Sequence, residues 1–158
     1  MTISIRTAEP SDLGTIFRFI CELADYEKLR HEVRADEATL GRFVFGPSPK
    51  AEVLIGEIDN QSCGFALFFH NFSTFKGRPG IYLEDLYVEP TARGSGLGKA
   101  LLQKLAAIAI ARECARLEWS VLDWNTPALS FYRSIGAKPM DEWTVHRVDG
   151  EALIALAG

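Results

Sequence analysis

A glycine-rich segment at residues 93–100, RGSGLGKA, has the residue types of an anion-binding loop. It does not fit a nucleotide P-loop, because Arg93 stands where the first glycine is needed and Ala100 where the metal-binding hydroxyl is needed. It does not fit a G-x-G-x-x-G fingerprint either, since Lys99 or Leu101 falls at the last glycine. Glycines before a helix still let backbone N–H groups and the positive end of the helix dipole approach an anion. The segment therefore predicts a diphosphate site, helped by its two cations.

Two adjacent carboxylates, Glu84 and Asp85, interrupt the apolar run just before this loop. Successive side chains of a strand point to opposite faces, so regular alternation places the two acids on opposite sides of the sheet. An acid at a strand end near a cofactor loop is a candidate general base, and we assign this role to Glu84. A buried carboxylate otherwise requires hydrogen-bonding partners, and we expect Asp85 to be a structural acid. On this interpretation the two acids are not a catalytic pair.

Interleaved strands and helices must position these groups, which predicts an α/β or mixed α+β sheet. Apolar residues recur at helical spacing after the N-cap chemistry of residues 10–12, and no linker or repeat divides the chain, so we expect a single domain over residues 1–158. We expect strands over residues 2–6, 51–58, 63–72, 81–88, 116–122 and 143–148, and helices over residues 9–29, 36–45, 98–114 and 126–136.

Composition narrows the classes of function. The 158 residues are 47% hydrophobic with a net charge of −4, which suits a soluble globular protein and argues against nucleic acid or an anionic membrane as a partner. The three cysteines are far apart and lack C-x-x-C spacing, which indicates a reducing compartment. With no signal peptide and no long apolar run, we expect a cytoplasmic protein. No His/Cys/Asp spacing predicts a metal site.

The motif Arg-x-x-Gly-x-Gly, present as Arg93, Gly96 and Gly98, resembles the acetyl-CoA signature of the GNAT N-acetyltransferases. The segments ELADYEKL, YLEDLYVEP, RGSGLGKALL and WNTPALSFYRSIGA, with a tryptophan near the end, follow in the order of the spermidine/spermine (diamine) and thialysine branch. The resemblance covers nearly the whole chain. It implies a mostly antiparallel twisted sheet with helices on both faces, acetyl-CoA as co-substrate, a small-molecule amine acceptor and a homodimer.

The resemblance also implies residue roles. Glu84 would help to deprotonate the amine through water, the backbone N–H of Leu86 would polarise the thioester carbonyl, and Tyr132 would be the general acid toward the CoA thiolate. The implied cofactor contacts are Leu86, Tyr87, Val88, Arg93, Gly94, Ser95, Gly96, Leu97, Gly98, Lys99, Asn125, Pro127, Ala128 and Tyr132. The expected substrate-binding residues are Tyr26 and Glu27, which match the branch, with Glu84, and an acidic aromatic groove of Glu118, Trp119, Asp123 and Trp143.

Two questions stay open at the level of sequence. The acceptor is either a polyamine or diamine, or a lysine-like amino acid such as thialysine. The alternative to an enzyme is a domain of the same fold that binds acyl-CoA as a sensor without catalysis, although Glu84, Asn125 and Tyr132 argue against it.

Overall fold

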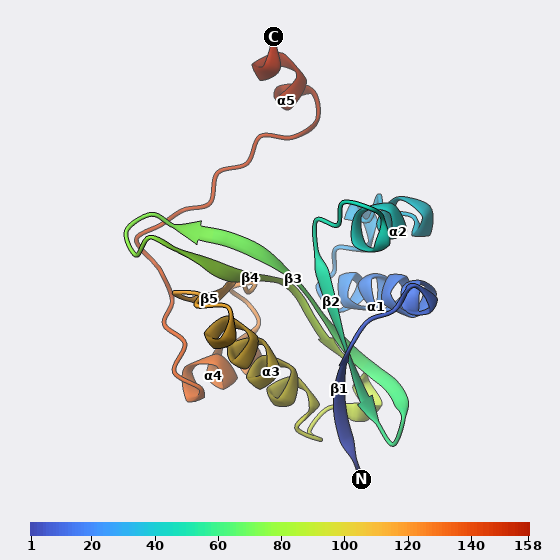
Figure 1. Ribbon diagram of the computed structural model, residues 1–158. Coiled ribbons are helices and arrows are strands. Elements are labelled where there is room, and N and C mark those ends of the chain that lie inside the picture. The colour runs from blue at the N-terminus through green and yellow to red at the C-terminus, as the bar shows by residue number, and fades with distance from the viewer. The chain divides into compact units, whose positions relative to one another are not determined.

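The computed structural model describes residues 1–158, which divide into two compact units, residues 1–120 and residues 121–158. A five-stranded sheet in the order β1-β2-β3-β4-β5 runs through the first unit (Figure 1). The strands are β1 (Ile3–Thr7), β2 (Glu52–Ile58), β3 (Gln61–Ser73), β4 (Arg78–Val88) and β5 (Leu117–Trp119). All neighbours are antiparallel except β4 and β5, which are parallel. The predicted mixed, mostly antiparallel sheet is therefore confirmed.

Helices cover both faces of this sheet. On one face, Ile16 and Phe19 of α1 (Leu13–Tyr26) and Val44 of α2 (Glu37–Phe45) pack against Ile55 and Phe65 of the sheet. On the other face lies α3 (Leu97–Ala111), whose Leu97 and Leu101 side chains occupy the space beside Gly56. The two neighbours Ile55 and Gly56 thus face different layers, as the alternation of a strand requires.

The end of α1 shapes the space in front of β4. The helix ends at Tyr26, and Lys28 then adopts a positive φ of 62°. The N–H of Leu29 donates back to the carbonyl of Ala24 (2.8 Å), and a short 3-10 turn follows at residues 30–32. This turn brings residues 27–33 back alongside the helix that precedes them.

The second unit holds α4 (Thr126–Ser134) and α5 (Gly150–Ala157). The strand expected over residues 143–148 is wrong, because that segment has no regular structure and its Trp143 and Val145 side chains are 74% and 82% exposed. A strand forms only beside a partner strand, and none pairs with this segment in the chain. The strand expected over residues 116–122 is shorter than predicted, because β5 covers only Leu117–Trp119.

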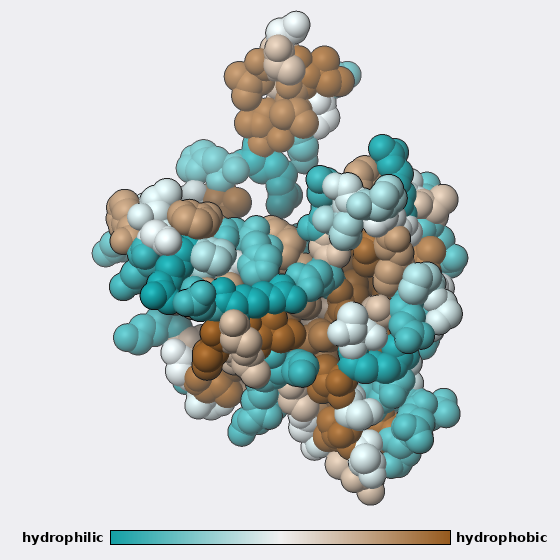
Figure 2. Space-filling view, viewed as in Figure 1, coloured by the Kyte–Doolittle hydropathy of each residue, from teal (hydrophilic) through white to brown (hydrophobic).

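Helix α5, which we did not predict, shows mainly hydrophobic side chains (Figure 2). That residues 1–158 form a single domain stays a prediction.

Candidate active site

A β-bulge in β4 decides where the two adjacent carboxylates lie. Leu83 is opposite Phe68 and Asp85 is opposite Leu67, so Glu84 has no partner on β3. A bulge residue interrupts the regular alternation of side chains along its strand. Glu84 and Asp85 consequently line the same pocket. The prediction that the two acids lie on opposite faces is wrong for this reason.

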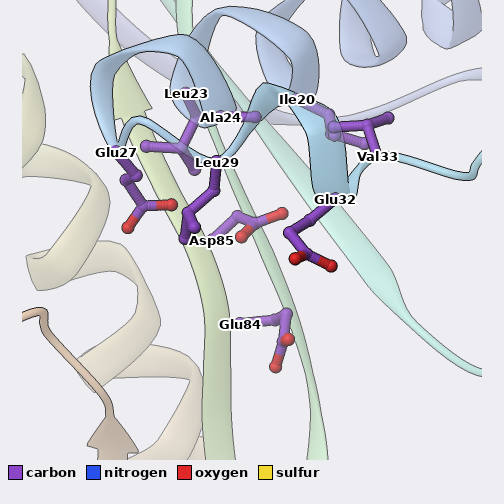
Figure 3. Close-up of a pocket in the computed structure, with 9 residues that line it drawn as sticks. All are labelled: Ile20, Leu23, Ala24, Glu27, Leu29, Glu32, Val33, Glu84 and Asp85. Carbon is purple, nitrogen blue, oxygen red and sulfur yellow. The ribbon is translucent and has the colours of Figure 1, made fainter.

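This pocket lies between β4, the last turns of α1 and the turn that follows them (Figure 3). Its volume is about 320 Å³, within the usual range for sites of small molecules. One part of its wall is acidic and the other is apolar, and no lysine or arginine lines it. The acids are Glu27, Glu32, Glu84 and Asp85, and the apolar residues are Ile20, Leu23, Ala24, Leu29 and Val33.

The electrostatics of the pocket favour a cationic ligand. Burial, with smaller contributions from the charges of Glu84 and Glu27, raises the pKa of Asp85 to about 7. Burial also raises the pKa of Glu27. Negative charges that lack a nearby cation repel one another, so a bound ammonium group would lower both pKa values and would be attracted in return. Asp85 is therefore a member of a charged site and not only the structural acid that we expected.

The raised pKa of Asp85 predicts a stability cost that an amide would avoid. Between the unfolded pKa near 4 and the folded value of about 7, the folded protein keeps a proton that the unfolded chain has released. Stability therefore falls as pH rises through this window. Since one pKa unit is worth about 1.4 kcal/mol and the part of this window above pH 5 spans about two units, the unfolding free energy of Asp85→Asn relative to the unmodified protein should grow by about 2.5 kcal/mol between pH 5 and pH 8.

Urea unfolding of both proteins at the two pH values measures this difference. Asp141→Asn removes one negative charge at an exposed position and serves as the control. An equal stability difference at pH 5 and pH 8 for Asp85→Asn would show that the carboxyl is not destabilised by its surroundings.

The glycine-rich loop has the backbone that an anion site needs. Gly94 and Gly96 have φ angles of 80° and 93°, a region that favours glycine, and Gly96 is the N-cap of α3. Apart from Gly94 and its two chain neighbours, no residue has an atom within 4 Å of the position that a Cβ would take at Gly94, so the loop is open there. The N–H of Leu97 donates to the Ser95 hydroxyl oxygen (3.2 Å). The next amides of the first turn have no helical partner, as at the start of any α-helix. Lys99 is exposed beside them.

The strand that leads into this loop has an open edge. The pairing of β4 with β5 ends at Leu83 and Trp119, although β4 continues to Val88. Within residues 1–120, the β5 side of residues 84–88 is therefore not paired with a strand. This edge contains Leu86, Tyr87 and Val88, the residues whose backbone groups we expected to contact a cofactor, and it ends shortly before the glycine-rich loop.

The structure does not bring all the predicted residues to this pocket. Glu118 forms an ion pair with Arg116 (2.9 Å) and accepts a hydrogen bond from the Asn71 amide (3.1 Å), and neither it nor Trp119 lines the pocket. Tyr26 does not line it either. The predicted residues of the second unit are Asp123, Asn125, Pro127, Ala128, Tyr132 and Trp143, and their placement against the pocket stays a prediction. Sequence reasoning missed Glu32, for which the turn after α1 gave no recognisable motif.

Comparison with known proteins decides the family. Residues 17–137 match the model of the acetyltransferase (GNAT) family, across both units of the structure. The chain belongs to the GNAT family. Its fold is therefore the GNAT fold, as predicted, and the protein is an acetyltransferase. The match includes β4 with its bulge, the glycine loop and α4.

Individual proteins are similar to this chain over nearly its full length. The thialysine N-epsilon-acetyltransferase of Bos taurus is 40% identical over 167 residues, which cover 99% of this chain and 98% of that protein. The L-ornithine N5-acetyltransferase NATA1 of Arabidopsis thaliana is 30% identical, with 96% of this chain and 86% of that protein covered. Among solved structures, the integron cassette protein VCH_CASS6 of V. cholerae has a TM-score of 0.81 at 32% identity, covering 99% and 98% of the two chains. The thialysine and ornithine acetyltransferases among these relatives support amine acetyltransferase activity.

No helix in this GNAT protein has both the length and the apolar composition that a membrane span requires. No group of three or more His, Cys, Asp or Glu side chains is arranged to hold a metal ion.

Proposed function

We propose that the protein transfers an acetyl group from acetyl-CoA to a primary amine at the end of a short flexible chain. The observation that carries this proposal is the pocket with four carboxylates and no basic residue. The acids would bind the ammonium group, and the apolar wall of α1 and its turn would contact the aliphatic chain. An α-carboxylate of the acceptor would then remain outside the pocket, because no cation lines it.

The donor is proposed to bind along the open edge of β4 and the loop that follows. The loop fits an anionic group because its glycines leave backbone N–H groups accessible beside Lys99. The free edge beyond Leu83 fits the pantetheine arm, since its backbone groups can pair with an extended amide chain. Acetyl-CoA supplies a thioester. The amine nitrogen attacks its carbonyl carbon to form an amide, and the C–S bond breaks to release CoA.

Two protons must move in this reaction, one from the acceptor amine and one to the CoA sulfur. An amine with a pKa near 10 is protonated at neutral pH, so it must lose a proton before it can attack. We assign the removal of this proton to Glu84, which would act through a water molecule. Before this step, Asp85 and Glu27 would bind the ammonium group. The Leu86 N–H donates to the thioester oxygen, and the Tyr132 hydroxyl gives its proton to the departing sulfur. Asn125, Pro127 and Ala128 are proposed to contact the cofactor.

Among acceptors we favour the side-chain amine of a lysine-like amino acid, such as thialysine, over spermidine or putrescine. The names of three relatives at 39–40% identity support this order, because all three are thialysine N-epsilon-acetyltransferases. A spermidine/spermine N(1)-acetyltransferase-like protein of Homo sapiens is 32% identical, which keeps the polyamines as the second class to test.

The acceptor is tested by thiol release from acetyl-CoA with a panel of thialysine, lysine, ornithine, spermidine and putrescine. We expect thialysine to have the highest kcat/KM. Nα-acetyl-lysine, which retains the side-chain amine, should react, whereas Nε-acetyl-lysine should not. A preference for spermidine would show that the acceptor is a polyamine and not a lysine-like amino acid. Binding of CoA without thiol release from any amine would favour the acyl-CoA sensor.

We further propose a cytoplasmic homodimer. The free thiols of Cys21, Cys63 and Cys114 support a reducing compartment. The exposed apolar side chains of the C-terminal segment, among them Trp143, Val145 and Ile154, support a contact with a second copy. Light scattering at several protein concentrations measures the mass in solution.

A further inference from the structure

The side chain of Arg93 lies between the glycine-rich loop (residues 93–100), where the donor is proposed to bind, and the end of α1. Its Nε donates to the carbonyl oxygen of Val88 at the end of β4 (3.2 Å). Its guanidinium carbon lies 5.0 Å from the centroid of the Tyr26 ring and 6.0 Å from that of Tyr87. Both distances are within the range of a cation–π contact. One planar cation thus contacts the last residue of α1, the last residue of β4 and a core tyrosine.

The two aromatic partners differ in how firmly they are held. Tyr87 is buried, and its ring packs against Phe19 of α1 at 5.7 Å between centroids. Tyr26 is 40% exposed at the very end of α1. Tyr87 therefore gives the guanidinium a fixed support, whereas Tyr26 is the partner whose position the guanidinium can influence.

Tyr26 stands directly before the turn that completes the acidic pocket. The next residue, Glu27, lines the pocket, and so do Leu29 and Glu32 of the same turn. Glu27 directly follows Tyr26, so a single peptide bond joins it to the residue whose ring contacts Arg93. A displacement of the backbone at Tyr26 would therefore also displace Glu27, which lines the pocket together with Asp85 of β4.

We propose that Arg93 is a positioning residue for the acceptor, acting through Tyr26. The stack of Arg93 on Tyr26 fixes the end of α1 against the glycine-rich loop, so that an anion in the loop and an amine in the pocket stabilise the same arrangement. The inference rests on the proposed function, because it assigns the acceptor to this pocket. It differs from a direct contact between Tyr26 and the amine, since Tyr26 is absent from the pocket wall.

A double-mutant cycle at saturating acetyl-CoA tests this route. Tyr26→Leu should raise the KM for the amine about three- to fivefold, the equivalent of one exposed cation–π contact, with little change in kcat. Tyr26→Phe keeps the ring and should keep the low KM. In an Arg93→Gln background, which lacks the cation, Tyr26→Leu should raise the KM no further. Equal effects of Tyr26→Leu in both backgrounds would overturn the proposal and indicate direct contact with the amine.

Hydrogen exchange with CoA alone as the probe separates this inference from the proposed function. CoA should slow exchange of the amides at residues 93–99 and also at residues 27–33, and Tyr26→Leu should remove only the second effect. Protection of 93–99 without protection of 27–33 in the unmodified protein would overturn the coupling while leaving the donor site intact. No protection at 93–99 would instead contradict the donor site itself, and the coupling with it.

Discussion

Tyr132→Phe should lower kcat by about 100-fold, the lower end of what a positioned general acid contributes. The thiolate of CoA leaves more readily when a proton reaches its sulfur as the C–S bond breaks, and phenylalanine cannot supply that proton. The KM for acetyl-CoA should change little, because the ring remains. Tyr132 lies in the last turn of α4, two residues before the helix ends at Ser134, and its ring is 5.7 Å from that of Phe131.

The measurement is steady-state turnover with the preferred amine under conditions where chemistry limits the rate. Tyr82→Phe is the matched control, because it removes a phenol whose oxygen contacts the Ser120 hydroxyl (2.7 Å) and which has no proposed role. If Tyr132→Phe turns over at a near-normal rate while single-turnover kinetics confirm that chemistry is limiting, another group protonates the sulfur.

Removing two charges from the acidic pocket has the second large effect. Glu27→Gln combined with Asp85→Asn should raise the KM for the amine by about 100-fold, since a hydrogen bond to a charged group is worth roughly 1.5–3 kcal/mol and each 1.4 kcal/mol is tenfold. The KM for acetyl-CoA should stay the same, because neither residue belongs to the glycine-rich loop and both substitutions keep the backbone groups through which the free edge of β4 is proposed to bind the pantetheine arm. The initial rate at varied amine concentration measures the change.

The pH dependence gives this prediction an internal control. Because the pKa of Asp85 is about 7, the carboxyl is largely protonated at pH 6 and ionised at pH 8. The KM for the amine should therefore fall over this range in the unmodified protein. The decrease should be absent from the double variant and present in Asp141→Asn. A low amine KM in the double variant would place the acceptor elsewhere, for example beside Glu118.

The layered mixed sheet could be predicted from sequence because local patterns determine it. Apolar residues of α1 recur at helical spacing, and those of β2 and β3 form short runs around a turn at residues 59–60. The glycine-rich turn before α3 could also be predicted, since the positive φ angles at Gly94 and Gly96 favour glycine there. In both cases the neighbouring residues carry the information.

The bulge at Glu84 could not be predicted in the same way. A bulge depends on how β4 registers against β3, and one shifted residue changes the face on which every later side chain lies. Regular alternation therefore separated Glu84 from Asp85. The missed role of Glu32 has a similar cause, because the left-handed turn at Lys28 returns that residue to the pocket. The segment 143–148 alternates like a strand, but no strand of the chain pairs with it.

The most direct test of the central claim follows the acetyl group itself. The protein is incubated with acetyl-CoA labelled in the acetyl group and with thialysine, and the products are separated and identified by mass spectrometry and NMR. We predict label on the side-chain nitrogen of the amino acid in an amount equal to the free CoA released, with none retained on the protein. Release of CoA without a labelled amine, or no release with any amine of the panel, would contradict the account.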